Sequence, residues 1–128
     1  MTRLALAFFT AAACCALIGM MWGIHMGMTE TFTLAPAHAH LNLVGWATLA
    51  LMGAFYAAAG DRASTRLGWL NFALSTAGVV VFVPSLAILL ATTGKGNLGL
   101  IVGPFLALAG MATFLVVVIG VWRKPARA

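Results

Sequence analysis

The chain has three histidines, and two of them, His38 and His40, stand two positions apart in the segment P-A-H-A-H-L-N-L-V-G-W (residues 36–46). Imidazole is the commonest metal-binding side chain and a usual axial ligand of haem iron. In a helix, residues two apart are rotated by about 200° around the axis. The pair therefore predicts two ligands that point toward two separate sites on opposite faces of one helix, whereas in a strand both would address one metal.

Haem b is the first cofactor that this pattern indicates, with His38 and His40 as the ligands of the iron. Haem needs axial imidazoles and a flat apolar slot between helices. Trp46 is a candidate for lining such a slot, and aromatic packing is the commoner reason for a tryptophan there. Asn42 is a candidate for orienting a ring nitrogen or a bound water, with a helix–helix hydrogen bond as an equal alternative. Small residues that allow close approach follow the histidines: Gly45, Ala47, Ala50, Gly53 and Ala54.

Copper is the second cofactor that the sequence indicates. His25, Met26 and Met28 form the segment H-M-G-M, and copper(I) prefers thioether and imidazole ligands. Together with His38 or His40 they predict a copper site. Methionine is also ordinary filler in apolar helices, so haem is favoured. His25 could instead pair with His38 or His40 around a haem site within one chain.

The other polar residues exclude several classes of function. Glu30 and Asp61 are the only acidic residues, and both fall between apolar segments, so no carboxylate proton relay or carboxylate-bridged di-iron site is expected. The sequence contains no nucleophile–base arrangement and no glycine-rich phosphate loop. The sequence therefore indicates no catalytic residue, and any enzyme activity would be that of an oxidoreductase-type haem protein. The net charge of +5 does not indicate nucleic-acid binding, because the basic residues flank apolar runs.

The elements that must position the histidines are membrane-spanning helices. Hydrophobic residues make up 63% of the 128 residues and charged residues 7%, with a mean hydropathy of +1.08. This composition predicts an integral membrane protein with one all-α domain, residues 1–128. A spanning helix needs about 20 apolar residues, and short connectors make successive helices antiparallel. We expect four transmembrane helices, at about residues 4–27, 36–59, 67–92 and 98–122.

Basic residues orient these helices. Cytoplasmic loops carry an excess of lysine and arginine, and Lys95 is the only such residue that falls on the outer side of a four-helix arrangement. Both termini are therefore expected in the cytoplasm of a bacterium, with the histidine cluster near the periplasmic face of the inner membrane. The basic residues on the inner side are Arg3, Arg62, Arg66, Arg123, Lys124 and Arg127.

The first apolar run and the aromatic residues near the inner ends of the helices lead to two further expectations. The N-terminal apolar run is longer than the hydrophobic region of a typical signal peptide, so we expect the first helix to be retained. Tyr56, Trp69 and Trp122 lie near the inner ends of the predicted spans. Amphipathic aromatic residues are enriched at membrane–water interfaces, so these three are expected to anchor the helices there.

The segment A-H-A-H-L-N-L-V-G-W-A-T-L-A-L-M-G (residues 37–53) resembles a helix of the haem–copper oxidase catalytic subunit, especially in its cbb-type and nitric-oxide-reductase-like branches. The resemblance implies that His38 binds a high-spin haem and His40 a low-spin haem, on opposite faces of the helix. The chain lacks the H-x-x-x-Y element and the adjacent histidine pair of the family's copper centre. The resemblance therefore does not extend to oxygen reduction.

The resemblance also implies an assembly. The twelve helices of the family resemble three four-helix arcs around a pseudo-threefold axis, and this chain has the size of one arc. In a homotrimer, His38 of one chain would face the same slot as His40 of its neighbour, and each slot would hold one bis-histidine haem b. We expect electron transfer, with a redox partner protein, or binding of O₂ or NO. The alternatives are a copper-binding protein that faces the periplasm and a non-catalytic partner of a respiratory complex.

Overall fold

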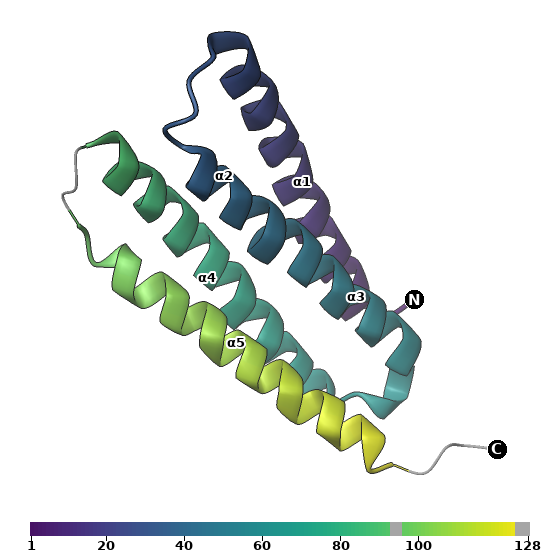
Figure 1. Cartoon of the computed structure of the whole chain (residues 1–128). Coiled ribbons are helices and arrows are strands. Elements are labelled where there is room, and N and C mark those ends of the chain that lie inside the picture. Colours follow the sequence, from purple (N-terminus) through teal and green to yellow (C-terminus); the bar gives the residue numbers. More distant parts are fainter. Residues whose placement is uncertain (93–95, 125–128) are drawn as a thin grey trace.

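The computed structural model describes residues 1–92 and 96–124, and every regular element within these ranges is a helix. Four helical segments there are long and apolar enough to cross a membrane (Figure 1). The predicted all-α fold is confirmed, and the helix ends differ from the predicted ones by only a few residues. Three segments are single helices: α1 (Arg3–Thr29), α4 (Thr65–Ala91) and α5 (Gly99–Trp122). The remaining segment has four parts: α2 (Ala35–His40), η1 (Leu41–Ala47), α3 (Thr48–Ala59) and η2 (Gly60–Arg62).

The start of α1, the α3–α4 connection and the end of α5 lie at one end of the structure, here called the basic end (Figure 1). Arg62 joins the α3–α4 connection to the end of α5, because its Nη2 donates to the carbonyls of Val121 and Lys124, each at 3.0 Å. Lys124 Nζ donates in return to the carbonyl of Arg62 at 2.7 Å. Lys95 and Arg127, which enter the predicted orientation, lie outside the described residues. The opposite end, where α1 ends and α2 begins, is called the histidine end.

The helices pack as two hairpins with a shared core. α1 runs along η1 and α3, while α4 runs along α5. The larger core cluster lies toward the basic end and joins Phe8 of α1, Leu49 of α3 and Val117 of α5. A smaller cluster lies toward the histidine end, and its buried members are Leu41, Val79 and Val83. The core is therefore thinner beside the histidines.

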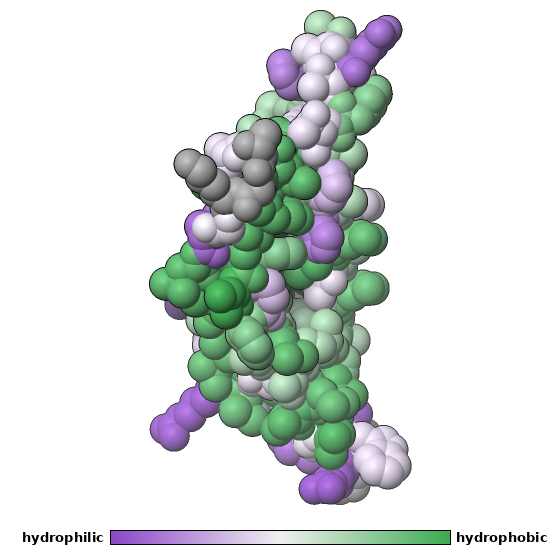
Figure 2. All heavy atoms as spheres, turned by 60° about the vertical axis from the view of Figure 1, so that its left-hand side comes forward, coloured by the Kyte–Doolittle hydropathy of each residue, from purple (hydrophilic) through white to green (hydrophobic). Residues whose placement is uncertain are grey.

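The outer faces of the helices are apolar. Figure 2 shows hydrophobic side chains over the middle of one face and hydrophilic ones mainly toward the two ends. Leu51 is 71% exposed, Phe105 66% and Leu108 64%. Contiguous apolar surface of this kind is uncommon on soluble proteins and is compatible with a lipid bilayer.

The expected anchoring role of Tyr56 is wrong. Its side chain is only 1% exposed, and its hydroxyl donates to Oδ1 of Asn71 at 3.2 Å. Asn71 Nδ2 in turn donates to the carbonyl of Gly110 at 2.8 Å and to Oγ of Ser75 at 3.2 Å. Asn71 is fully buried and links α3, α4 and α5, because a buried polar group must find partners inside the protein.

We expect Asn71→Leu to lower the free energy of unfolding by about 1–2 kcal/mol, since it leaves the buried Tyr56 hydroxyl without its acceptor and removes a bond between helices. Ser75→Ala is the matched control, because it keeps the bonds of Asn71 to Tyr56 and Gly110 and should cost less. Unfolding of the detergent-purified variants by sodium dodecyl sulfate gives both values. An Asn71→Leu variant as stable as the wild type would show that this network does not hold the helices together.

Candidate functional site

The histidine pair lies in α2, at the start of the second apolar segment. Pro36 occupies the first turn of α2, where its missing N–H is not needed. The carbonyl of Leu34 accepts from the N–H of His38 at 3.0 Å, so the helix already holds its first histidine. His38 and His40 are both half-buried. The start of α2 therefore fixes the backbone of both residues before the chain enters the core.

The helix widens immediately after His40. Residues Leu41–Ala47 form the π-helix η1, and the N–H of Thr48 bonds to the carbonyl of Leu43, five residues back. Thr48 Oγ1 donates to the same carbonyl at 2.8 Å. π-Helical turns are rare and occur frequently at functional sites. The sequence predicted an ordinary helix here, and no residue pattern in the segment signals the wider turn.

His40 is oriented by its own helix. Its Nδ1 lies 2.7 Å from the carbonyl oxygen of Pro36. A carbonyl can only accept, so Nδ1 carries a proton, and in the neutral ring the lone pair is on Nε2. Nε2 has no hydrogen-bond partner in the part of the chain that the structure describes. In metal-binding histidines, the ring nitrogen that does not bind the metal usually donates to a carboxylate, a backbone carbonyl or water.

The His40 ring also contacts α4. Its centroid lies 5.1 Å from that of Phe82, and the two rings are at 89° to each other. This edge-to-face contact is a favourable geometry for aromatic rings. Together with the Pro36 bond it restricts both rotatable bonds of the His40 side chain.

His38 contacts α1 instead. Its ring centroid lies 6.3 Å from that of Trp22, at an angle of 85°. A Cβ atom at Gly23 would lie 3.1 Å from Cε1 of His38, so the absent side chain of this glycine makes room for the ring. The two histidines therefore contact different helices, α1 and α4, in keeping with the rotation of about 200° between positions two apart.

Asn42 lies beside His38. Its Nδ2 donates to the carbonyl of His38 at 2.9 Å and lies 3.4 and 3.3 Å from the two ring nitrogens. Its amide also rests on Gly19 of α1, where a Cβ atom would lie 2.6 Å from Oδ1. The amide thus stands next to the His38 ring, one helical turn further along the same helix. Its hydrogen bonds in the structure are made within that helix.

Trp46 and the H-M-G-M residues are placed apart from these contacts. The Trp46 side chain is 49% exposed, so it is accessible to a group outside the chain. Met26 is 6% exposed, whereas His25 is exposed and Met28 is 81% exposed. In residues 1–92 and 96–124, no three His, Cys, Asp or Glu side chains form a group that could hold a metal ion. The copper site stays a prediction.

An apolar cavity of about 400 Å³ lies between α1, η1 and α4. Neither His38 nor His40 lines it, although Trp22 and Leu41 beside them do. A group bound to the free Nε2 of His40 therefore has no slot in this cavity. The remaining lining residues are Cys15, Ile18, Val79, Val80, Val83 and Pro84.

We expect Gly19→Val to lower the free energy of unfolding by about 1 kcal/mol, because the Asn42 amide must turn away from α1 and give up its hydrogen bond to the carbonyl of His38. The side chain would collide with the Asn42 amide, which lies 2.6–2.8 Å from the Cβ position. Gly27→Val is the matched control on the same helix, since nothing lies within 4 Å of its Cβ position. Equal losses for the two variants in detergent unfolding would contradict the packing of Asn42 on α1.

The sequence did not indicate Gly19, Gly23 and Phe82 as part of the site. These residues become neighbours of the pair only when α1 and α4 pack against α2, and glycine and phenylalanine are common in apolar helices.

Comparison of the chain with protein-family models, with curated proteins and with solved structures finds no match.

Proposed function

We propose that the chain is a multi-pass protein of the bacterial inner membrane, with both termini in the cytoplasm and the histidine end near the periplasmic face. Its four apolar helices and their exposed apolar side chains support insertion in a bilayer. The orientation is supported by the basic residues at one end of the helices, because positive charge is retained on the cytoplasmic side. Among the described residues these are Arg3, Arg62, Arg66, Arg123 and Lys124.

Within that membrane the chain is proposed to bind haem b through His38 and His40, as a small relative of one four-helix arc of the haem–copper oxidase catalytic subunit. The observation that carries this proposal is the bond from His40 Nδ1 to the Pro36 carbonyl. In the neutral ring this bond leaves the lone pair of Nε2 available, which is what a ligand of haem iron needs. Trp46, exposed further along the helix, is proposed to cover part of the macrocycle.

The haem is proposed to lie between chains. His38 contacts α1 and His40 contacts α4, so one chain does not direct both imidazoles at one iron. A second copy supplies the missing ligand when His38 of one chain and His40 of another share a slot. In a closed homotrimer every such slot is equivalent, and each chain contributes one ligand to each of two slots.

Two histidine ligands favour electron transfer over gas binding. Haem, when bound, would supply a reversible one-electron change, and iron held by both His38 and His40 would have no position left for O₂ or NO. The chain's own contribution is to fix the two imidazoles and to surround them with apolar side chains. A redox partner protein would dock at the histidine end. A copper protein using His25, Met26 and Met28 is the alternative that the test below separates.

The test is a titration of haem into the detergent-purified protein, followed by reduction and addition of CO. We expect a low-spin spectrum that CO leaves unchanged. A spectrum that CO shifts would mean an open coordination position and would support gas binding instead. Failure to bind haem, together with stoichiometric binding of copper(I), would overturn the proposal in favour of the copper site.

A further inference from the structure

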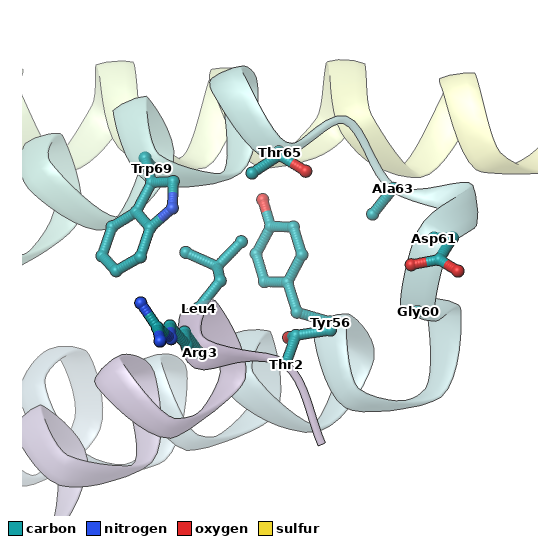
Figure 3. A pocket seen from close by; sticks show the side chains of 9 residues that line it. All are labelled: Thr2, Arg3, Leu4, Tyr56, Gly60, Asp61, Ala63, Thr65 and Trp69. Atoms are coloured by element: carbon teal, nitrogen blue, oxygen red, sulfur yellow. The ribbon is translucent and has the colours of Figure 1, made fainter.

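A second cavity lies at the basic end (Figure 3). Its volume is about 340 Å³. It opens between the first turns of α1 and α4, with Tyr56 of α3 between them. Unlike the apolar cavity near the histidines, it has charged and hydroxyl side chains in its wall. The lining residues are Thr2, Arg3, Leu4, Tyr56, Gly60, Asp61, Ala63, Thr65 and Trp69.

One side of this cavity favours an anion. Arg3 lines it, and its guanidinium forms no hydrogen bond or ion pair with the other described residues, so it is free to bind a ligand. α1 and α4 both begin beside the cavity, and the N-terminus of a helix carries a partial positive charge. Figure 3 shows the Arg3 guanidinium beside Trp69, and such a group can donate two parallel hydrogen bonds to a phosphate.

The other side favours a cation. Asp61 lines the cavity in η2, and its carboxylate has no partner in residues 1–92 and 96–124. Figure 3 shows Arg3 and Asp61 on opposite sides of Tyr56. The cavity wall thus presents a positive and a negative group that do not neutralise each other. This arrangement is complementary to a zwitterion with a phosphate at one end and an ammonium at the other.

The surroundings of the cavity are suited to acyl chains. Trp69 lines the cavity and is 43% exposed, and Leu70 and Leu6 nearby on α4 and α1 are 48% and 47% exposed. A tryptophan that is half buried and half exposed is typical of the level of the lipid headgroups. A lipid whose headgroup enters the cavity can therefore lay its chains along the apolar faces of α1 and α4.

We propose that this cavity binds the headgroup of an aminophospholipid, with the phosphate at Arg3 and the ammonium at Asp61. The inference requires only that the chain crosses a bilayer, and it is independent of haem binding. An ammonium donates hydrogen bonds to a carboxylate, whereas the trimethylated ammonium of phosphatidylcholine cannot. The site therefore discriminates between these two lipids, and it prefers the zwitterion to an anionic lipid that leaves Asp61 unpaired.

The test uses the intact detergent-purified protein and native mass spectrometry with phosphatidylethanolamine, phosphatidylcholine and phosphatidylglycerol of identical acyl chains. We expect phosphatidylethanolamine to bind tightest. Arg3→Gln should weaken the binding of all three lipids. Asp61→Asn should weaken only the binding of phosphatidylethanolamine, to the level of phosphatidylcholine. Each loss should be about tenfold, because one hydrogen bond to a charged group is removed. Arg66→Gln is the matched control, because Arg66 is exposed on α4 and does not line the cavity.

Three results would overturn the inference. Equal binding of phosphatidylethanolamine and phosphatidylcholine would show that Asp61 does not bind the ammonium. Tighter binding of phosphatidylglycerol would show that the site prefers an anionic lipid. Displacement of the lipid by millimolar inorganic phosphate would mark a simple phosphate site. Haem content measured on the same samples separates this outcome from that of the histidine pair, since neither Arg3 nor Asp61 lies near His38 or His40.

Discussion

His40→Ala is expected to abolish haem binding, while His25→Ala leaves it unchanged. The expectation rests on the His40 ring, whose Nδ1 bonds to the Pro36 carbonyl at 2.7 Å and whose Nε2 is left without a partner. Losing an outer-shell partner alone costs about 10–100-fold in metal affinity, and loss of the ligand itself should cost more. His25 is the matched control, because it is the third histidine of the chain and is exposed at the end of α1.

The measurement is haem per chain, by absorption, in variants purified under the same conditions. Because the side chain of His40 packs on Phe82, Phe82→Ala serves as a second control for loss of packing. That variant should retain the low-spin spectrum with weaker binding. If His25→Ala loses haem and His40→Ala keeps it, the ligands lie at the end of α1 and the assignment of the site is wrong.

Mixing two inactive variants is expected to restore haem binding. His38→Ala and His40→Ala subunits each lack one ligand, so a homo-oligomer of either has no complete slot. When they assemble together at equal amounts, a slot is complete only where an intact His38 meets an intact His40. Random assembly completes about a quarter of all slots, and in the mixed trimers that carry both tags about one slot in three is complete. Co-expression with two affinity tags and a haem assay on the doubly tagged fraction measures the recovery.

The same experiment distinguishes a haem site shared between chains from a site within one chain. If both ligands of one iron come from a single chain, no mixture of the two variants contains a complete site, and recovery stays at zero. Variants mixed after separate purification, without exchange of subunits, are the control. Recovery in the co-expressed sample alone would support the shared slot.

The helices could be predicted from the sequence because their signal is local. Runs of apolar residues of sufficient length define each segment, and short connectors define the neighbours. The π-helix η1 could not be predicted, because no residue pattern in Leu41–Ala47 distinguishes a π-helical turn from an α-helical one. Tyr56 was misassigned for a related reason. Its position near the end of a span is typical of an interface anchor, and its real partner, Asn71, is on another helix.

The site could be predicted only in part. The divergence of His38 and His40 follows from helix geometry, and the structure places them against α1 and α4 accordingly. The environment of each ring depends on residues distant in sequence, such as Gly23 and Phe82. Met26 is buried, whereas Met28 is exposed. Their positions in the sequence do not show which of the two packs against a neighbouring helix. The Pro36 carbonyl was not expected as a partner because backbone atoms leave no signature in residue identity.

Cofactor analysis of the wild-type protein, purified in detergent from cells, tests the central claim most directly. Porphyrin is measured as the pyridine haemochrome, and iron and copper are measured by mass spectrometry on the same sample. We predict haem b with an equal amount of iron, about one of each per chain, since each chain of a closed ring contributes to two shared slots. Copper without porphyrin, or neither metal in a correctly folded protein, would contradict it.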